Sequence, residues 1–151
     1  MLRQKLTDAL KQAMRDKDQR RVSTVRLILA ALKDRDIAAR PKGNTTGIAD
    51  PEIQHMMQGM VKQRRESIVL YEQGNRPDLV QQEREEIAVI ESFMPAQLSD
   101  AEAEAAIKAV IAELGATGVK DMGRVMTALR ERHAGRMDLG KAGPVVKQLL
   151  G

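Results

Sequence analysis

Apolar residues recur along this 151-residue chain with the period of an α-helix. The clearest case is residues 120–134, where Met122, Val125, Met126 and Leu129 fall on one face. Gly135 is expected to end that helix, because a residue without a Cβ accepts a left-handed backbone with little strain. The pattern predicts an all-α protein with helices at about 2–16, 20–39, 50–73, 77–93, 99–114, 120–134 and 139–151.

Short breaks between these segments predict how the helices are grouped. Breaks near residue 17 and at Gly74 indicate that the first four helices form two antiparallel hairpins. We therefore expect an N-terminal helical domain at residues 1–93, a short connector at 94–98 and a C-terminal three-helix domain at 99–151. The loop over residues 41–50 is rich in glycine and small polar residues, so we expect it to be flexible.

Two charged residues lie within otherwise apolar stripes of the second hairpin. With the turn at Gly74, an antiparallel register sets Arg64 opposite Glu83. The sequence therefore predicts a partly buried Arg64–Glu83 ion pair, of a kind that fixes register more than it adds stability.

The composition excludes several classes of chemistry. The chain has no cysteine, so disulfides, thiolate nucleophiles and cysteine metal ligands are ruled out. Its serines and two histidines lie in no catalytic or metal-binding motif, and no phosphate-binding glycine loop occurs. We expect no catalytic residues, no metal and no cofactor. Because no segment resembles a leader or a membrane span, we expect a cytoplasmic protein without a membrane partner.

Charge is distributed unevenly along the chain. Residues 1–42 hold twelve basic and five acidic side chains, residues 43–102 hold five and eleven, and residues 103–151 hold eight and five. Basic ends around an acidic middle favour a polyanionic partner, although ordinary charge scatter gives the same totals. Arg26, Lys33 and Arg40 recur every seven residues and form a basic stripe, for which solubility is the simpler explanation.

Four stretches of the chain resemble the YqeY family. They are RLILAALK at 26–33, VKQRRESIVLYEQGNRPDLVQQEREE at 61–86, FMPAQLS at 93–99 and DMGRVMTALRERHAGRMD at 121–138. This family comprises small bacterial proteins whose C-terminal part is similar to the tail of the B subunit of the tRNA-dependent amidotransferase. The resemblance implies a two-part all-helical fold and a link to tRNA and translation. It also implies the activity of a carbon–nitrogen ligase that uses glutamine as amide donor. The sequence, however, shows neither a glutaminase site nor a loop that would bind the phosphates of ATP.

The glycine-and-basic signature of that tail maps to Gly123, Arg124, Val125, Met126, Gly135 and Arg136. The family usually has Gly-Lys-Ala-Asp/Asn where this chain has Gly135-Arg136-Met137-Asp138. Arginine keeps the charge of lysine, and methionine is expected to place a bulkier group beside the turn.

The resemblance and the charge pattern lead to one main hypothesis and two alternatives. The main hypothesis is a non-catalytic module that binds tRNA through a basic edge, with Gly135 allowing close approach. The alternatives are a docking protein for an amidotransferase or an aminoacyl-tRNA synthetase without RNA contact, and an enzyme acting with glutamine. In the main hypothesis the stripe of Arg26, Lys33 and Arg40 extends the footprint, and the phosphate contacts are Lys120, Arg124, Arg130, Arg132 and Arg136.

Overall fold

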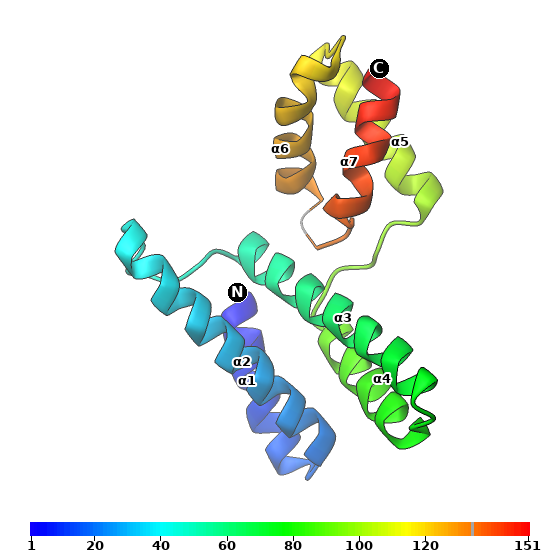
Figure 1. The fold of residues 1–151 in the computed structure, drawn as a ribbon. Helices are drawn as coiled ribbons and strands as arrows, with labels where there is room; N and C mark the ends of the chain where they lie inside the picture. The colour runs from blue at the N-terminus through cyan, green and yellow to red at the C-terminus, as the bar shows by residue number, and fades with distance from the viewer. Residues whose placement is uncertain (134) are drawn as a thin grey trace. The chain divides into compact units, whose positions relative to one another are not determined.

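The computed structural model describes residues 1–133 and 135–151, and these residues form helices and connecting loops without strands (Figure 1). The all-α prediction is confirmed. The chain divides into two compact units, Met1–Met94 and Pro95–Gly151. Within the described residues, no helix has the length and apolar character needed to cross a membrane. The helices are α1 (Leu2–Arg15), α2 (Gln19–Ala39), η1 (Arg40–Lys42), α3 (Asp50–Gln73), α4 (Pro77–Glu91), α5 (Asp100–Leu114), η2 (Val119–Asp121), α6 (Met122–Arg132) and α7 (Leu139–Leu150).

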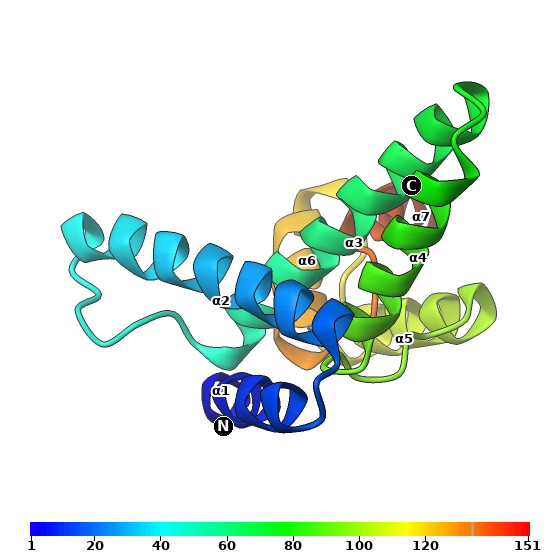
Figure 2. The same ribbon diagram turned by 90° about the horizontal axis from the view of Figure 1, so that it is seen from below.

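The first unit consists of two helical hairpins. Figures 1 and 2 show α1 beside α2 and α3 beside α4, and α2 also packs on α4. The Asp18 side chain accepts a hydrogen bond from the Arg21 backbone N–H and so caps α2. Because the chain has almost no aromatic residues, the centre of this unit is aliphatic, with fully buried Leu6, Ile28, Ile53, Met57 and Ile90.

The segment between η1 and α3 is held in place, which corrects the prediction of a flexible loop at 41–50. Ile48 is buried in the core, and its backbone N–H donates to Asp36 Oδ1 at 2.9 Å. Its carbonyl accepts from Arg3 Nη2 at 3.0 Å, while Arg3 also binds both carboxylate oxygens of Asp36. Asn44 folds the preceding turn by accepting from the Thr46 and Gly47 N–H groups. Composition alone does not reveal these contacts, because they come from distant residues.

The predicted ion pair across the second hairpin forms with a different glutamate. Arg64 Nε lies 2.9 Å from Glu86 Oε2, so the partner is Glu86 and not Glu83. Helical side chains lean toward the N-terminus of their own helix, and Arg64 reaches back to donate to the Met60 carbonyl at 3.2 Å. On an antiparallel neighbour this displacement leads to later residues, which accounts for the shift from Glu83 to Glu86.

The second unit packs α5, α6 and α7 around a core that contains Ile107, Val110, Val125, Leu129 and Val146. Ser99 and Glu102 form a capping box at the start of α5, with both of its hydrogen bonds present.

Candidate nucleic-acid interface

The turn between α6 and α7 is fixed by the segment that precedes α5. The Leu98 N–H donates to the Arg136 carbonyl at 2.9 Å, and Arg136 Nε donates to the Ala96 carbonyl at 3.1 Å. The Gln97 side-chain amide donates to the carbonyl of Gly135. Residues 96–98, which the sequence analysis treats as a connector, therefore hold the basic turn in place.

Gly135 has φ +76°, the left-handed conformation predicted from the sequence. The residue is buried, and its carbonyl is occupied by Gln97. These contacts give the glycine a role in the shape of the turn and place it away from the surface that a phosphate would reach. The predicted end of the helix at residue 134 lies outside the described residues.

Substituting Gly135 with alanine is expected to lower the free energy of unfolding by about 1–2 kcal/mol, because a Cβ is strained at this positive φ. Gly123→Ala is the matched control, since Gly123 lies in α6 with open space around its Cα. That variant is expected to gain about 0.5–1 kcal/mol from helix propensity. Urea denaturation measures both, and a Gly135→Ala protein as stable as wild type would contradict the assigned role.

Met137 points into the interior of the second unit. Its side chain is buried in the core with Val125 and Val146. The expectation that methionine adds bulk beside the turn is therefore wrong, because the side chain lies on the inner side. Asp138 follows and caps α7 by accepting from the Gly140 N–H at 2.9 Å.

Two of the predicted RNA-binding arginines are engaged by carboxylates. Arg124 Nη2 lies 3.1 Å from Asp121 Oδ1. Arg132 binds both oxygens of Glu113 on α5, with 2.9 Å from Nη2 to Oε1, and this contact lowers the pKa of the Glu113 carboxyl. Both arginines stay largely exposed, so these pairs are weak and can exchange for a phosphate.

Lys120 and Arg130 are the cations of the predicted set that remain free. Both are exposed, and neither side chain has a hydrogen bond or ion pair with another described residue. Arg130 and Arg132 lie roughly 200° apart around α6, so the two side chains leave opposite flanks of the helix.

The six predicted residues therefore do not form one continuous edge. Lys120 lies just before α6 and Arg124 lies in its first turn. Arg130 and Arg132 lie in the last turn of α6, roughly 9–12 Å further along the helix axis than Arg124, and Arg136 follows in the α6–α7 turn. The structure thus brings Arg132 and Arg136 close to His133 at the α6–α7 turn. Arg130 lies on the opposite flank of α6, and two further cations lie at the other end of the helix.

His133 lies beside Arg132 and Arg136. Its ring is half-buried, and Nδ1 has no hydrogen-bond partner among the described residues. Burial, followed by the charges of Arg136 and Arg132, lowers the pKa of His133 below its ordinary value. The histidine is therefore neutral at pH 7, and the charge of the turn comes from the arginines.

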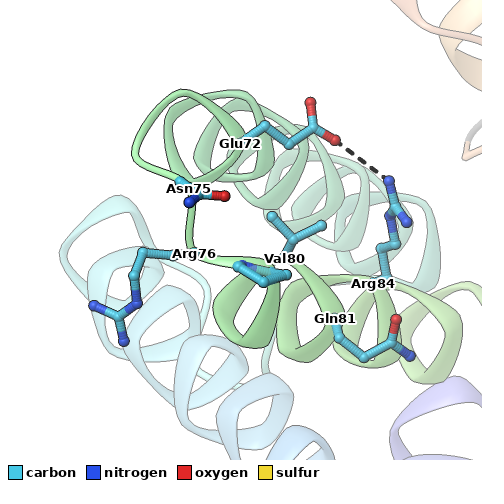
Figure 3. A pocket seen from close by; sticks show the side chains of 7 residues that line it. Glu72, Asn75, Arg76, Val80, Gln81 and Arg84 are labelled. Atoms are coloured by element: carbon cyan, nitrogen blue, oxygen red, sulfur yellow. Dashed lines mark hydrogen bonds and ion pairs between the residues drawn. The ribbon is translucent and has the colours of Figure 1, made fainter.

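A shallow hollow lies at the tip of the α3–α4 hairpin (Figure 3). Figure 3 shows Glu72 reaching across it to Arg84, and the two side chains are 3.3 Å apart. Arg76 is likewise held by Asp78. Both arginines of the hollow are thus paired with a carboxylate, in side-chain pairs that are exposed to solvent. No group of three or more histidine, aspartate or glutamate side chains in the described part of the chain is arranged to hold a metal. The hollow measures about 350 Å³ and is lined by Glu72, Asn75, Arg76, Pro77, Val80, Gln81 and Arg84.

Comparison with known proteins identifies relatives of the chain. It is 32% identical over 108 residues to the protein named altered inheritance of mitochondria protein 41, mitochondrial, of Lachancea thermotolerans, covering 70% of this chain and 55% of that protein. The proteins of the same name from Eremothecium gossypii and Kluyveromyces lactis are 35% and 30% identical over 91 residues. Each of these two matches covers 60% of this chain, and 48% and 47% of the respective relatives. The chain thus spans about half the length of the curated relatives it matches.

These names overturn the cytoplasmic location predicted from the sequence. That prediction is wrong, because the relatives are named as mitochondrial proteins. The model of the family described as Yqey-like protein matches residues 3–150, nearly the entire chain. The chain belongs to the YqeY family.

Proposed function

We propose that this protein is a non-catalytic helical module that binds tRNA through the α6–α7 turn of its second unit. The observation that carries the proposal is that three arginines lie at the end of α6 and in the turn, with Arg132 and Arg136 beside His133 and Arg130 on the other flank of the helix. Arg130 is free, and Arg132 is exposed while paired. Arg136 is fixed by the Ala96 carbonyl, so its guanidinium is positioned before any ligand arrives.

The resemblance to the tail of the amidotransferase B subunit supports tRNA as the ligand. Of the family's glycine-and-basic signature, Gly135 and Arg136 lie in the α6–α7 turn, whereas Gly123 and Arg124 lie in the first turn of α6. A guanidinium binds phosphate through two parallel hydrogen bonds, so arginines suit an RNA backbone.

The expected mode of recognition is through phosphates and not through bases. Proteins that read single-stranded RNA stack the bases on aromatic rings. The chain's two aromatic residues, Tyr71 and Phe93, both lie in the first unit. Binding should therefore be insensitive to RNA sequence and strongly dependent on salt.

Replacing Arg130, Arg132 and Arg136 together with glutamine is expected to weaken binding to bulk tRNA and to reduce the log–log salt slope. Each phosphate contact contributes about 0.7–0.9 to that slope, so the triple variant should lose roughly two units. Filter binding at several salt concentrations gives both quantities. Arg130→Glu is a second variant, expected to leave the fold intact because the Arg130 side chain is exposed and forms no hydrogen bond or ion pair with another described residue.

The control for this experiment removes three cations elsewhere. Lys5→Gln/Lys11→Gln/Lys62→Gln makes the same change in net charge at exposed lysines of the first unit that have no side-chain partner among the described residues, and it is expected to leave the tRNA affinity nearly unchanged. Equal losses in the two triple variants would overturn the assignment to the turn. Absence of tRNA binding by wild type at low salt would favour the competing proposal of docking on an amidotransferase or aminoacyl-tRNA synthetase.

A further inference from the structure

The outer face of the α1–α2 hairpin carries a row of side chains that the proposed function does not use. Arg26, Ala30, Lys33, Ile37 and Arg40 follow one another at intervals of four and three residues, so they lie in one line along α2. All five are exposed, while other faces of α2 pack on α1, α3 and α4. This outer row is about 21 Å long and alternates between cationic and apolar side chains.

The cations of this hairpin lack the carboxylate partners that occur elsewhere in the unit. In the α3–α4 hairpin, every arginine is paired with a glutamate or aspartate. In contrast, nine of the twelve cations in residues 1–42 have no side-chain hydrogen bond or ion pair to any described residue, and all nine are exposed. They are Lys5, Lys11, Arg15, Lys17, Arg26, Lys33, Arg35, Arg40 and Lys42.

Aliphatic side chains are exposed among these free cations. Ile37 and Leu27 on α2 are each 46% exposed, and Met14 on the adjoining helix α1 is 52% exposed. About half of the surface of each residue is therefore open to solvent. Asp34 borders the row three residues before Ile37 and about two turns after Leu27, and it offsets one of the row's three positive charges.

We propose that the outer row binds the surface of an anionic lipid bilayer. Its cations would contact the lipid phosphates, while Ile37 and Leu27 enter the layer between the headgroups and the acyl chains. RNA phosphates account for the cations but give the exposed aliphatic side chains nothing to contact. A surface contact needs no membrane-spanning helix, so this proposal departs from the sequence expectation of no membrane partner.

The test is flotation of the full-length protein with vesicles of phosphatidylcholine containing 40% phosphatidylglycerol, beside vesicles of phosphatidylcholine alone. Wild type is expected to float with the anionic vesicles and much less with the neutral ones. Arg26→Gln/Lys33→Gln/Arg40→Gln should weaken partitioning by about fivefold for each cation, or roughly a hundredfold in all. Leu27→Ser/Ile37→Ser keeps the charge and should weaken it by about tenfold.

Two controls separate this surface from a general effect of charge. Lys62→Gln/Lys141→Gln/Lys147→Gln removes three other exposed cations that have no side-chain partner among the described residues, and it should float like wild type. The arginine-to-glutamine variant of the α6–α7 turn should also float like wild type, even where its tRNA binding is lost. Circular dichroism verifies that each variant is folded.

Three results would overturn the proposal. One is failure of wild type to float with anionic vesicles at low salt. Another is an equal loss in the lysine control. The third is unchanged flotation of Leu27→Ser/Ile37→Ser together with tRNA displacing the protein from vesicles, which would make the outer row a nucleic-acid surface.

Discussion

Replacing Arg64 with alanine is expected to lower the free energy of unfolding by about 3–5 kcal/mol, because the change leaves the Glu86 carboxylate without its main partner in a largely buried site. The side chains of Arg64 and Glu86 are 13% and 9% exposed. Arg20 lies 3.9 Å from the other oxygen of Glu86, too far to replace the hydrogen bond from Arg64 Nε. Urea denaturation followed by circular dichroism measures the loss.

Two further variants show whether the cause is the unpaired charge. Arg64→Met/Glu86→Leu removes both charges and fills the site with apolar groups, so it should recover most of the stability that Arg64→Ala loses. Glu83→Gln should leave the stability unchanged or raise it. Burial, followed by repulsion from Glu86, raises the pKa of the Glu83 carboxyl, so at neutral pH its charge is unfavourable in the folded state. A large destabilisation by Glu83→Gln would contradict the observed choice of partner.

The same ion pair shows what hairpin register can predict. The positions of apolar residues and of Gly74 were enough to place Arg64 against the charged part of α4. They could not choose between Glu83 and Glu86, because that choice depends on the direction in which a long side chain leaves its helix. Backbone register follows from a repeating pattern, whereas the contacts of an individual side chain depend on its rotamer.

A similar distinction applies to the basic turn. The left-handed conformation of Gly135 follows from the helix pattern and the need for a residue without a Cβ. The pairing of Arg132 with Glu113 on α5 depends on how two helices pack, and the pattern of one segment does not contain that information. The sequence therefore predicts that cations gather in this region, while the fold determines which of them are free.

In the first unit, the spacing of the charged residues predicted a surface feature that the overall composition does not reveal. The seven-residue spacing of Arg26, Lys33 and Arg40 predicted a stripe, and the structure shows these side chains exposed and unpaired among the described residues. The intervening Ala30 and Ile37 became meaningful only after the structure showed that both residues are exposed. An apolar residue on a helix is expected to be buried in a core. The sequence alone therefore does not reveal that Ala30 and Ile37 are exposed.

Replacing Asp36 with asparagine is expected to lower the free energy of unfolding at pH 7 by about 1–3 kcal/mol, because the change weakens the attachment of the segment before α3. Asp36 accepts hydrogen bonds from both Arg3 terminal nitrogens and from the Ile48 N–H. Asparagine has one acceptor oxygen and no charge, so it cannot satisfy these donors together. Faster hydrogen exchange at the Ile48 amide should accompany the loss.

The dependence of this effect on pH identifies the carboxylate as its source. The hydrogen bond from Arg3 is the main cause that lowers the pKa of the Asp36 carboxyl in the folded protein, with the Ile48 N–H contributing further. A lowered folded-state pKa means that the stabilisation is complete above the unfolded value of about 4 and is lost as the pH falls through the folded value. The stability difference between wild type and Asp36→Asn should therefore shrink below about pH 4. Asp34→Asn, on the same helix with an exposed side chain and no side-chain partner among the described residues, should show little difference at any pH. If the two variants behaved alike, the segment would owe its position to burial of Ile48 and not to the charged contact with Arg3.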